Sequence, residues 1–555
     1  MKKILALFLS AVMVLSLFTG CNQGGQTPTE PGSTEPPVTG VVATTDVEGY
    51  EKYLSYTLSE ADTEEFYDTL QALENCLLAG MDWERAEMLE EQLDELGYYF
   101  SDQQSIAYIL MSMDGDNETY SDYYTDSTAI WTDLVTAYKK TARRVYTSDS
   151  ALKEQYFADW TEAEIREMMN YTEEVAALEK RNAEILVEFR ALEESTMERD
   201  MIPLYRELVL NNNRIAQLAG YNNYYEYAYE LRYSRDYEPG QVQQVRDYVA
   251  EYIAPAFPNV MNKTISLLGQ LDKDETDTIS ELLFQKDFDT LSINYVEDYI
   301  NTLPASAKAS MQKMFLENRA VFANNDSAHE GAFTTAVGDG LMCYFGPGYQ
   351  GTSTAIHELG HFYALNYFLQ VNPDMNAISL DLAEVHSQGN EWLFTGYLKD
   401  ILDEQAYETL VYYRMYENMA GILVQVCVDG FEELVYTHPD VASLTEEDFE
   451  ALMEQVCESY GGIDFFQKSI TDIQWYWRMV VLESPVYYIS YAVSSIAALD
   501  IYFACEENYE EAMAVYCALV EQVDEEGEFI ANLQRVGLHG PFEPDVYQAL
   551  AELAK

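Results

Sequence analysis

The chain has 555 residues, of which 96 are Asp or Glu and only 31 are Lys or Arg, so its formal charge at pH 7 is −65. A negative charge of this size repels nucleic acid and anionic membrane surfaces, and we expect neither as a partner. The acidic residues are spread along the chain rather than gathered in one tail, which favours a well solvated globular surface.

Residues 1–20 have the pattern of an export signal. Two lysines precede an apolar run at 4–18 that is short for a membrane span. Small residues follow the run and stand just before Cys21, which is similar to the lipobox of bacterial lipoproteins. This resemblance implies cleavage after Gly20 and lipidation of Cys21, and the alternative is an ordinary secretory signal. Both interpretations place the protein outside the cytoplasm.

Residues 21–45 predict a flexible tether. They are rich in Gly, Thr, Pro, Ser and Glu and contain almost nothing apolar, so they cannot form a core. No later stretch is expected to be long and apolar enough to span a membrane. Membrane attachment would therefore come only through a lipid anchor on Cys21.

The remaining sequence, 46–555, contains no second linker of this composition. Apolar residues recur at helical spacing, proline is scarce, and alternating β-strand runs are hard to find. Thr161 and Glu164 have the spacing of a capping box, and Thr445 begins a similar segment. We therefore predict a predominantly α-helical protein.

Six further cysteines follow Cys21, mostly within apolar sequence and without the spacing of metal ligands. An exported protein can form disulfides, but in a chain this large we favour buried thiols. The six are Cys76, Cys343, Cys427, Cys457, Cys505 and Cys517.

The segment 354–365 carries the clearest chemical motif. His357 and His361 are four residues apart, so on an α-helix they lie one turn apart on the same face. Two imidazoles placed in this way can hold one Zn²⁺, and Glu358 would lie beside the open coordination position as general base. The chain has only six histidines, so two of them in this pattern on an apolar helix indicate a metal site.

The spacing also narrows the choice of a third ligand. A metzincin would carry Gly and His where this chain has Ala364 and Tyr367. We therefore expect a carboxylate from a second helix, and Glu384 in the segment 379–392 is the best candidate. Glu391 lies two helical turns further along the same face, which suits a partner that orients a ligand histidine.

Four segments together resemble one known family. The segment 357–361 reads His-Glu-Leu-Gly-His, 384–392 has the form E-x-x-S-Q-x-x-E-x, and 215–227 and 532–544 match in a looser way. The chain is in these respects similar to the thimet oligopeptidase and oligoendopeptidase F family of zinc peptidases. The resemblance covers about 200–555. It implies two helical lobes around a deep central cleft, one zinc per chain, and Glu384 as the third ligand.

The chain is divided accordingly into three parts. These are a signal peptide at 1–20, a tether at 21–45, and a helical peptidase domain at 46–555, with an N-terminal lobe at 46–200, a region resembling the family at 201–555, and a catalytic part at about 330–500.

The segment 488–494 resembles the tyrosine helix of these enzymes and of the angiotensin-converting enzyme group. A zinc peptidase needs a donor for the oxyanion of its tetrahedral intermediate, and the resemblance places Tyr491 in this role. Tyr488 would contact the substrate backbone or its carboxylate. The histidine that both groups carry upstream is missing here. Arg478 is the only cation nearby, and we expect it to bind a substrate carboxylate.

Glycines flank a short apolar run at 341–345. Their spacing does not match a phosphate-binding loop, so nucleotide binding is not expected. By likeness to the family, this run would be the edge strand of a small sheet near the metal helix and would pair with an extended substrate backbone.

These features predict zinc-dependent hydrolysis of peptide bonds in oligopeptides outside the cytoplasm. One alternative is a dipeptidyl carboxypeptidase similar to angiotensin-converting enzyme, for which Arg478 would hold the substrate C-terminus. A thermolysin-like endoprotease is disfavoured because its Asn-Glu block around the third ligand is missing. A peptide-binding lipoprotein without metal would have no use for the four residues of the metal motif. Nothing in the sequence indicates an oligomeric state.

Overall fold

The computed structural model describes residues 49–555 apart from short internal gaps. The positions outside the description are 1–48, 159, 191, 193–195, 286, 288–289, 326, 372–377 and 524–526. The predicted export signal, the tether and Cys21 therefore lie outside the described residues. Within the described residues helices dominate and one small sheet is present, which confirms the predicted helical class.

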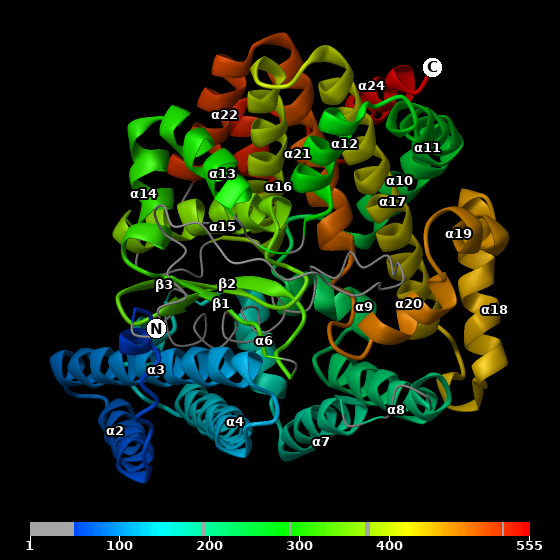
Figure 1. Cartoon of the computed structure of the whole chain (residues 1–555). Helices are drawn as coiled ribbons and strands as arrows, with labels where there is room; N and C mark the ends of the chain where they lie inside the picture. The colour runs from blue at the N-terminus through cyan, green and yellow to red at the C-terminus, as the bar shows by residue number, and fades with distance from the viewer. Residues whose placement is uncertain are drawn as a thin grey trace.

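The first long helices form a bundle with its own apolar core. α2 (Glu60–Ala79) and α3 (Trp83–Met113) form a hairpin, and α4 (Glu118–Tyr146) packs against both. Gly80 ends α2 in a left-handed conformation with φ 68°, which glycine adopts without strain. In Figure 1 this bundle lies below the sheet. Its core includes Phe66, Leu70, Leu93, Phe100, Leu134 and Tyr138.

Shorter helices connect this bundle to the rest of the molecule. They are η1 (Glu51–Tyr53), which precedes the bundle, and then α5 (Lys153–Tyr156), α6 (Glu162–Asn170), α7 (Glu173–Arg190), α8 (Met197–Leu218), α9 (Tyr224–Tyr227), η2 (Ala228–Arg232), α10 (Pro239–Tyr248), η3 (Val249–Ile253), α11 (Ala254–Leu268), α12 (Lys273–Leu283), α13 (Thr290–Thr302) and α14 (Ala305–Leu316). The capping box predicted at Thr161 is present, because Thr161 and Glu164 each accept the backbone N–H of the other.

The sheet has three strands in the order β1 (Ala320–Phe322), β3 (Gly340–Phe345), β2 (Ala332–Val337). β3 pairs in parallel with β1 and antiparallel with β2. The prediction that 341–345 forms an edge strand is therefore wrong, because β3 is the central strand, paired with β2 along its length and with β1 at residues 343–345. α15 (Thr352–Val371) packs against β2 and β3, so the small sheet does lie next to the metal helix (Figure 1).

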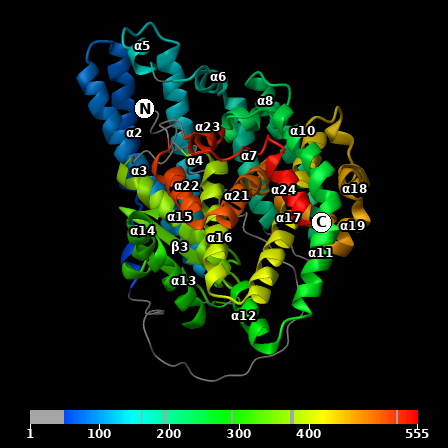
Figure 2. The ribbon, with the colours of Figure 1, turned by 90° about the horizontal axis from the view of Figure 1, so that it is seen from above.

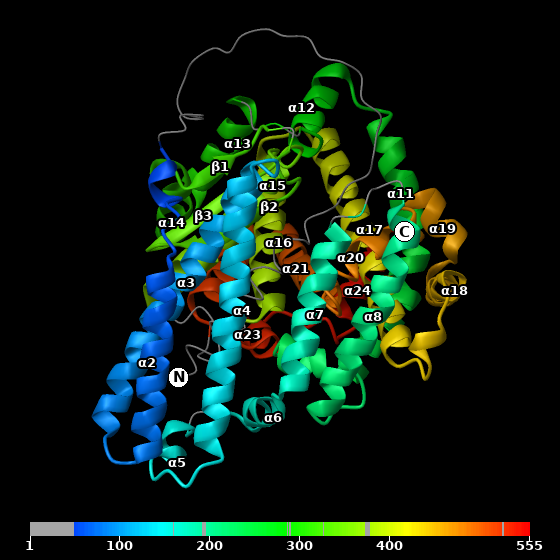
Figure 3. The ribbon, with the colours of Figure 1, turned by 90° about the horizontal axis from the view of Figure 1, so that it is seen from below.

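The C-terminal half is built from helices around one buried helix. In chain order they are α16 (Leu380–Tyr397), η5 (Leu398–Asp400), α17 (Glu404–Tyr436), η6 (Val441–Ser443), α18 (Glu446–Cys457), η7 (Glu458–Tyr460), α19 (Ile463–Ser469), α20 (Ile473–Val480), α21 (Ile489–Glu507), α22 (Tyr509–Glu521), α23 (Phe529–Val536) and α24 (Asp545–Leu553). The first eleven residues of α21 are all buried, since α16, α17, α22 and α24 pack around it. Figures 2 and 3 show α18 and α19 on the flank opposite the N-terminal bundle.

α21 also meets the length and composition of a membrane-crossing helix, contrary to the expectation that no stretch after the signal would. However, 78% of its apolar window is buried inside the protein. Because its neighbours already cover it, we interpret α21 as the core helix of this half.

The cysteines follow the prediction. All six that the structure describes are free thiols and all are buried. A buried free cysteine packs like a small apolar residue, and we assign this role in the core to all six.

Candidate metal centre

α15 and α16 bring the candidate ligands together. They pack side by side, and α15 is the helix that contacts the sheet (Figure 1). Asn390 on α16 donates its Nδ2 to Ile356 O on α15 at 2.6 Å, and its Oδ1 accepts the hydroxyl of Tyr299 at 2.7 Å. These buried hydrogen bonds fix α16 against α15 and so fix the ligands that each helix carries.

His357, His361 and Glu384 converge. Glu384 Oε2 lies 3.8 Å from Nε2 of His357 and 3.8 Å from Nε2 of His361. The three ligand atoms all lie within 4.8 Å of one another. Tetrahedral zinc with bonds of about 2.0–2.2 Å separates its ligand atoms by about 3.4 Å, so small side-chain movements would close the site around one ion.

Glu391 holds the first histidine. Its Oε1 lies 2.7 Å from His357 Nδ1, and its Oε2 accepts Nη1 of Arg414 at 2.7 Å. Burial acts to raise the pKa of Glu391, but the hydrogen bond and charge of His357 together with Arg414 outweigh burial and lower it. An ionised Glu391 orients the imidazole and makes it a stronger ligand. Arg414, on α17, is a contributor that the sequence analysis missed.

Burial sets the protonation states of the ligands. Burial raises the pKa of Glu384 to about 7, with the charge of His357 acting against this and that of Glu358 adding to it. Burial also lowers the pKa of His361 well below its usual value, and positive charge on His357 and His386 lowers it further. The neutral imidazole favoured here is the form that binds a metal. A divalent cation would also neutralise the buried carboxylates, so this donor set fits a metal.

Glu358 lies on the same helix with its side chain only 1% exposed. Its Oε2 accepts the hydroxyl of Thr334 from β2 at 2.7 Å. Thr334 Oγ1 lies 3.1 Å from Cys343 Sγ, so the thiol donates to Thr334 while Thr334 donates to Glu358. Burial raises the pKa of Glu358, against the opposing effects of His357 and Thr334. A raised pKa suits a group that must both take up and release a proton.

The two predicted tyrosines lie at the start of α21. Tyr491 is 5% exposed and accepts the hydroxyl of Tyr487 at 3.1 Å. Tyr488 is 2% exposed, its ring centroid lies 5.9 Å from that of Tyr491, and burial raises its pKa well above the usual value. The Tyr488 phenol therefore remains protonated at neutral pH. Tyr487 is a second residue that the sequence analysis missed.

The structure does not support the expected role of Arg478. Its side chain is 3% exposed and forms ion pairs with Glu446 at 3.3 Å and Glu450 at 2.9 Å. Its Nη1 also donates to Gln474 O at 2.6 Å. The guanidinium already interacts with two carboxylates and a carbonyl oxygen, which argues against the proposal that Arg478 binds a substrate carboxylate.

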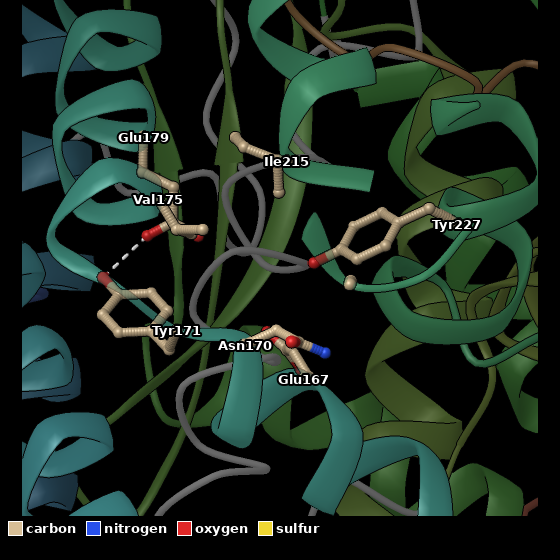
Figure 4. A pocket seen from close by; sticks show the side chains of 8 residues that line it. Glu167, Asn170, Tyr171, Val175, Glu179, Ile215 and Tyr227 are labelled. Atoms are coloured by element: carbon tan, nitrogen blue, oxygen red, sulfur yellow. Dashed lines mark hydrogen bonds between the residues drawn. The ribbon is translucent and has the colours of Figure 1, made fainter. Parts of the chain in front are cut away.

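A pocket lies elsewhere, between α6, α7, α8 and α9 (Figure 4). It is lined by Glu167, Asn170, Tyr171, Val175, Glu179, Ile215, Ala219 and Tyr227. Both of its carboxylates already have partners, since Glu167 pairs with Lys139 at 2.9 Å and Glu179 accepts the hydroxyl of Tyr171 at 2.8 Å. None of the predicted site residues lines this pocket.

Comparison by sequence finds no relative. No protein-family model matches the chain. No curated protein matches it.

Comparison by structure does find similar proteins. PZ peptidase A with an inhibitor matches with a TM-score of 0.66 at 17% identity, over 90% of this chain and 98% of that chain. A Bacillus anthracis protein provisionally assigned as an oligoendopeptidase F matches with a TM-score of 0.67 at 17% identity, over 92% and 98%. Trypanosoma cruzi metallocarboxypeptidase 1 matches with a TM-score of 0.53 at 11% identity, over 89% and 99%. At these identities the likeness shows a shared fold over nearly the whole length of each protein.

Proposed function

We propose that this chain hydrolyses peptide bonds in oligopeptides and uses one zinc ion per chain. The observation that carries the proposal is the convergence of His357, His361 and Glu384, whose ligand atoms lie within 4.8 Å of one another. Glu358 follows His357 on the same helix and is buried beside them. Two histidines and a carboxylate are the metal ligands of many zinc peptidases, in which the glutamate next to the first histidine acts as general base.

In the proposed reaction, bound zinc would polarise the scissile carbonyl and lower the pKa of the attacking water towards about 7. Glu358 takes the proton from that water and then delivers it to the leaving amine. Thr334 keeps the Glu358 carboxylate in place through their 2.7 Å hydrogen bond. Glu391 and Arg414 keep the His357 imidazole in one orientation.

Tyr491 is proposed to donate its hydroxyl to the oxyanion that develops on the scissile carbonyl. The hydroxyl of Tyr487 donates to the Tyr491 oxygen at 3.1 Å, which leaves the Tyr491 proton to be directed elsewhere. We place Tyr488, whose ring stacks edge-on against that of Tyr491, in contact with the substrate.

We favour internal cleavage of oligopeptides over removal of C-terminal residues. The structural matches include proteins described as an oligoendopeptidase and as a metallocarboxypeptidase. A dipeptidyl carboxypeptidase needs a cation to hold the substrate C-terminus, but Arg478 is committed to Glu446 and Glu450. The oligoendopeptidase activity requires no such anchor.

The test is a digest of matched peptides by the zinc-loaded protein, read by mass spectrometry. Each peptide is supplied with a free C-terminus and with an amidated one. An oligoendopeptidase cleaves both forms at the same internal bonds, whereas a carboxypeptidase requires the free carboxylate. Glu358→Gln serves as the inactive control. If the zinc-loaded wild type cleaves neither form, the proposed function is wrong.

We further propose that the protein works outside the cytoplasm, anchored to the bacterial membrane surface as a lipoprotein. The support is the lysine pair, the apolar run and the small residues that precede Cys21. The composition of 21–45 would then provide a flexible spacer between the lipid and the folded domain.

A further inference from the structure

A strained turn precedes the tyrosine helix. The chain between α20 and α21 turns at Ser484–Tyr487, where Tyr487 N donates to Ser484 O at 3.2 Å. Pro485 occupies the second position and Val486 the third, with Val486 at φ 62°. A type II turn requires positive φ at this third position and normally uses glycine there. A β-branched residue with positive φ is an outlier that persists only when its surroundings enforce it.

Three side chains enforce this conformation. Glu432 Oε1 on α17 accepts the N–H of Val486 at 2.9 Å. The hydroxyl of Tyr233 donates to Pro485 O at 2.8 Å. Nη2 of Arg235 donates to Val486 O at 2.9 Å. The turn therefore has both of its central peptide groups held by buried partners that are more than 50 residues away in sequence.

Arg235 also reaches into α21. The same Nη2 donates to Ser490 Oγ at 2.9 Å. The guanidinium is 4.4 Å from the ring centroid of Tyr229 and 4.6 Å from that of Tyr233, so aromatic rings fix its position as well. Ser490 lies directly before Tyr491. One buried cation thus joins the strained turn to the first turn of the tyrosine helix.

The opposing segment is strained too. Ser234, between Tyr233 and Arg235, has φ 45°. Ser234 and Val486 are two of the three non-glycine residues with positive φ in the described chain, and their segments contact each other. Each such residue costs on the order of 1–3 kcal/mol and tends to occur where geometry serves function. Because two such residues meet at one contact, this contact is a candidate for a positioning role.

We propose that Arg235 is a positioning residue which, together with Tyr233 and Glu432, sets the start of α21 and hence the hydroxyl of Tyr491. The catalytic role of Tyr491 in this inference rests on the proposed function. The role of Arg235 in holding the turn and Ser490 in place does not. Arg235 itself is 8% exposed and would not touch the substrate. Its effect would pass through the turn and Ser490 to Tyr491.

The test compares Arg235→Lys with Tyr491→Phe and with the double variant. A lysine keeps the charge, but it has no planar group to pack on the rings of Tyr229 and Tyr233, so its donor is not held between Val486 O and Ser490 Oγ. We expect Arg235→Lys to lower kcat by roughly 10–100-fold with zinc content and KM near wild type, since small misplacements of a catalytic group have effects of this size. In the double variant, kcat should fall little beyond Tyr491→Phe alone, because the two residues act through one hydroxyl. Multiplicative effects, or an unchanged kcat in Arg235→Lys, would overturn the proposal.

Arg319→Lys is the matched control. Arg319 is 6% exposed and pairs with Glu317 and Asp339, which flank β1 and β3 rather than the turn. We expect its replacement to leave kcat within about twofold, although both variants lose a buried guanidinium. A similar fall in kcat for both lysine variants would mean that general destabilisation, not positioning, is responsible.

Hydrogen–deuterium exchange tests the positioning without any turnover. Amides at 484–491 should exchange at least 10-fold faster in Arg235→Lys than in Arg319→Lys. Equal protection in the two variants would overturn the proposal, whereas an inactive wild type with this exchange pattern would overturn only the proposed function. If Arg235→Lys does not fold, Tyr233→Phe removes the hydroxyl that donates to Pro485 O and accepts the weaker 3.4 Å bond from Nε of Arg232. The same measurements and the same criteria then apply to Tyr233→Phe.

Discussion

Gly360 on α15 packs directly against the backbone of α16 at His386. A Cβ added to Gly360 would lie 2.5 Å from His386 O and 2.7 Å from the Cα of Ser387. Both are backbone atoms, which cannot rotate away as a side chain can. The absence of a side chain at Gly360 therefore sets the distance between the helix that carries the two histidines and the helix that carries Glu384.

We expect Gly360→Ala to weaken zinc binding and to destabilise the fold. The added methyl group would push α16 away from α15, and overpacking of this kind costs about 1–3 kcal/mol. Zinc titration and thermal unfolding measure the two effects. Gly240→Ala in α10 is the control, since a Cβ there meets nothing within 4 Å. Wild-type zinc affinity in Gly360→Ala would show that this contact does not set the ligand spacing.

Glu358→Gln should keep zinc and lose turnover. The amide is nearly the same size as the carboxylate but cannot accept the proton of the attacking water. Its hydrogen bond to Thr334 can be retained, so the local structure should persist. Metal content and kcat are measured on the same sample. A zinc-loaded variant with near-normal kcat would show that another group acts as the base.

The metal motif and helical class were predictable because both depend on local sequence. Helical spacing alone places His357 above His361, and an apolar helix alone implies burial. Glu384 was harder, since its approach to the histidines depends on how α16 packs. The segment around it has an acid in apolar sequence, which indicated a buried functional helix rather than a solvated face. The structure places its Oε2 3.8 Å from both histidines.

Two of the residues that the sequence did not reveal come from distant elements. Arg414 and Thr334 are ordinary residues in their own segments, and only tertiary packing brings them to Glu391 and Glu358. Tyr487 is close to Tyr491 in sequence, but their hydrogen bond depends on the turn that precedes α21. The ion pairs of Arg478 could not be predicted for the same reason, because Glu446 and Glu450 come from a helix whose position the sequence does not indicate. Strand order also depends on tertiary packing, so 341–345 was placed at the edge instead of the middle. The sequence did contain a clue to Arg414. It is an arginine within a largely apolar helix, and a buried arginine needs an acidic partner.

Cys21→Ala tests the proposed anchor. Cells grown with a labelled fatty acid should label the wild type but not Cys21→Ala, because the lipobox cysteine is the proposed attachment point. Cys76→Ala is the control, since Cys76 is a buried thiol and should not affect labelling. Absence of label in the wild type would favour the ordinary secretory signal, and equal label in wild type and Cys21→Ala would place the lipid elsewhere.

Tyr491→Phe should lower kcat by on the order of 10²–10³ while zinc content and KM stay near wild type. The change removes one hydroxyl that acts on the transition state and leaves the ring in the core of α21. Tyr502→Phe, further along the same helix and 3% exposed, is the matched control and should change kcat little. A rise in KM with unchanged kcat would instead assign Tyr491 to ground-state binding.

The last prediction separates the third ligand from the residues that support it. Glu384→Ala removes a charged oxygen donor from the metal, so zinc affinity should collapse. Glu391→Ala removes only the partner of His357 Nδ1, and affinity should weaken by roughly 10–100-fold. Arg414→Met should have an effect of similar size, because Glu391 then lies beside His357 without its 2.7 Å partner.

Competitive zinc titration against a chelator measures all four variants on one scale, with Tyr491→Phe as the variant that should match wild type. The expected order of affinity is Tyr491→Phe, then Glu391→Ala with Arg414→Met, then Glu384→Ala. A double variant of Glu391 and Arg414 should be little weaker than either single variant, because the two residues act through one imidazole. If Glu391→Ala loses zinc while Glu384→Ala retains it, the two carboxylates have exchanged roles, and the 3.8 Å spacing around Glu384 is not that of a ligand.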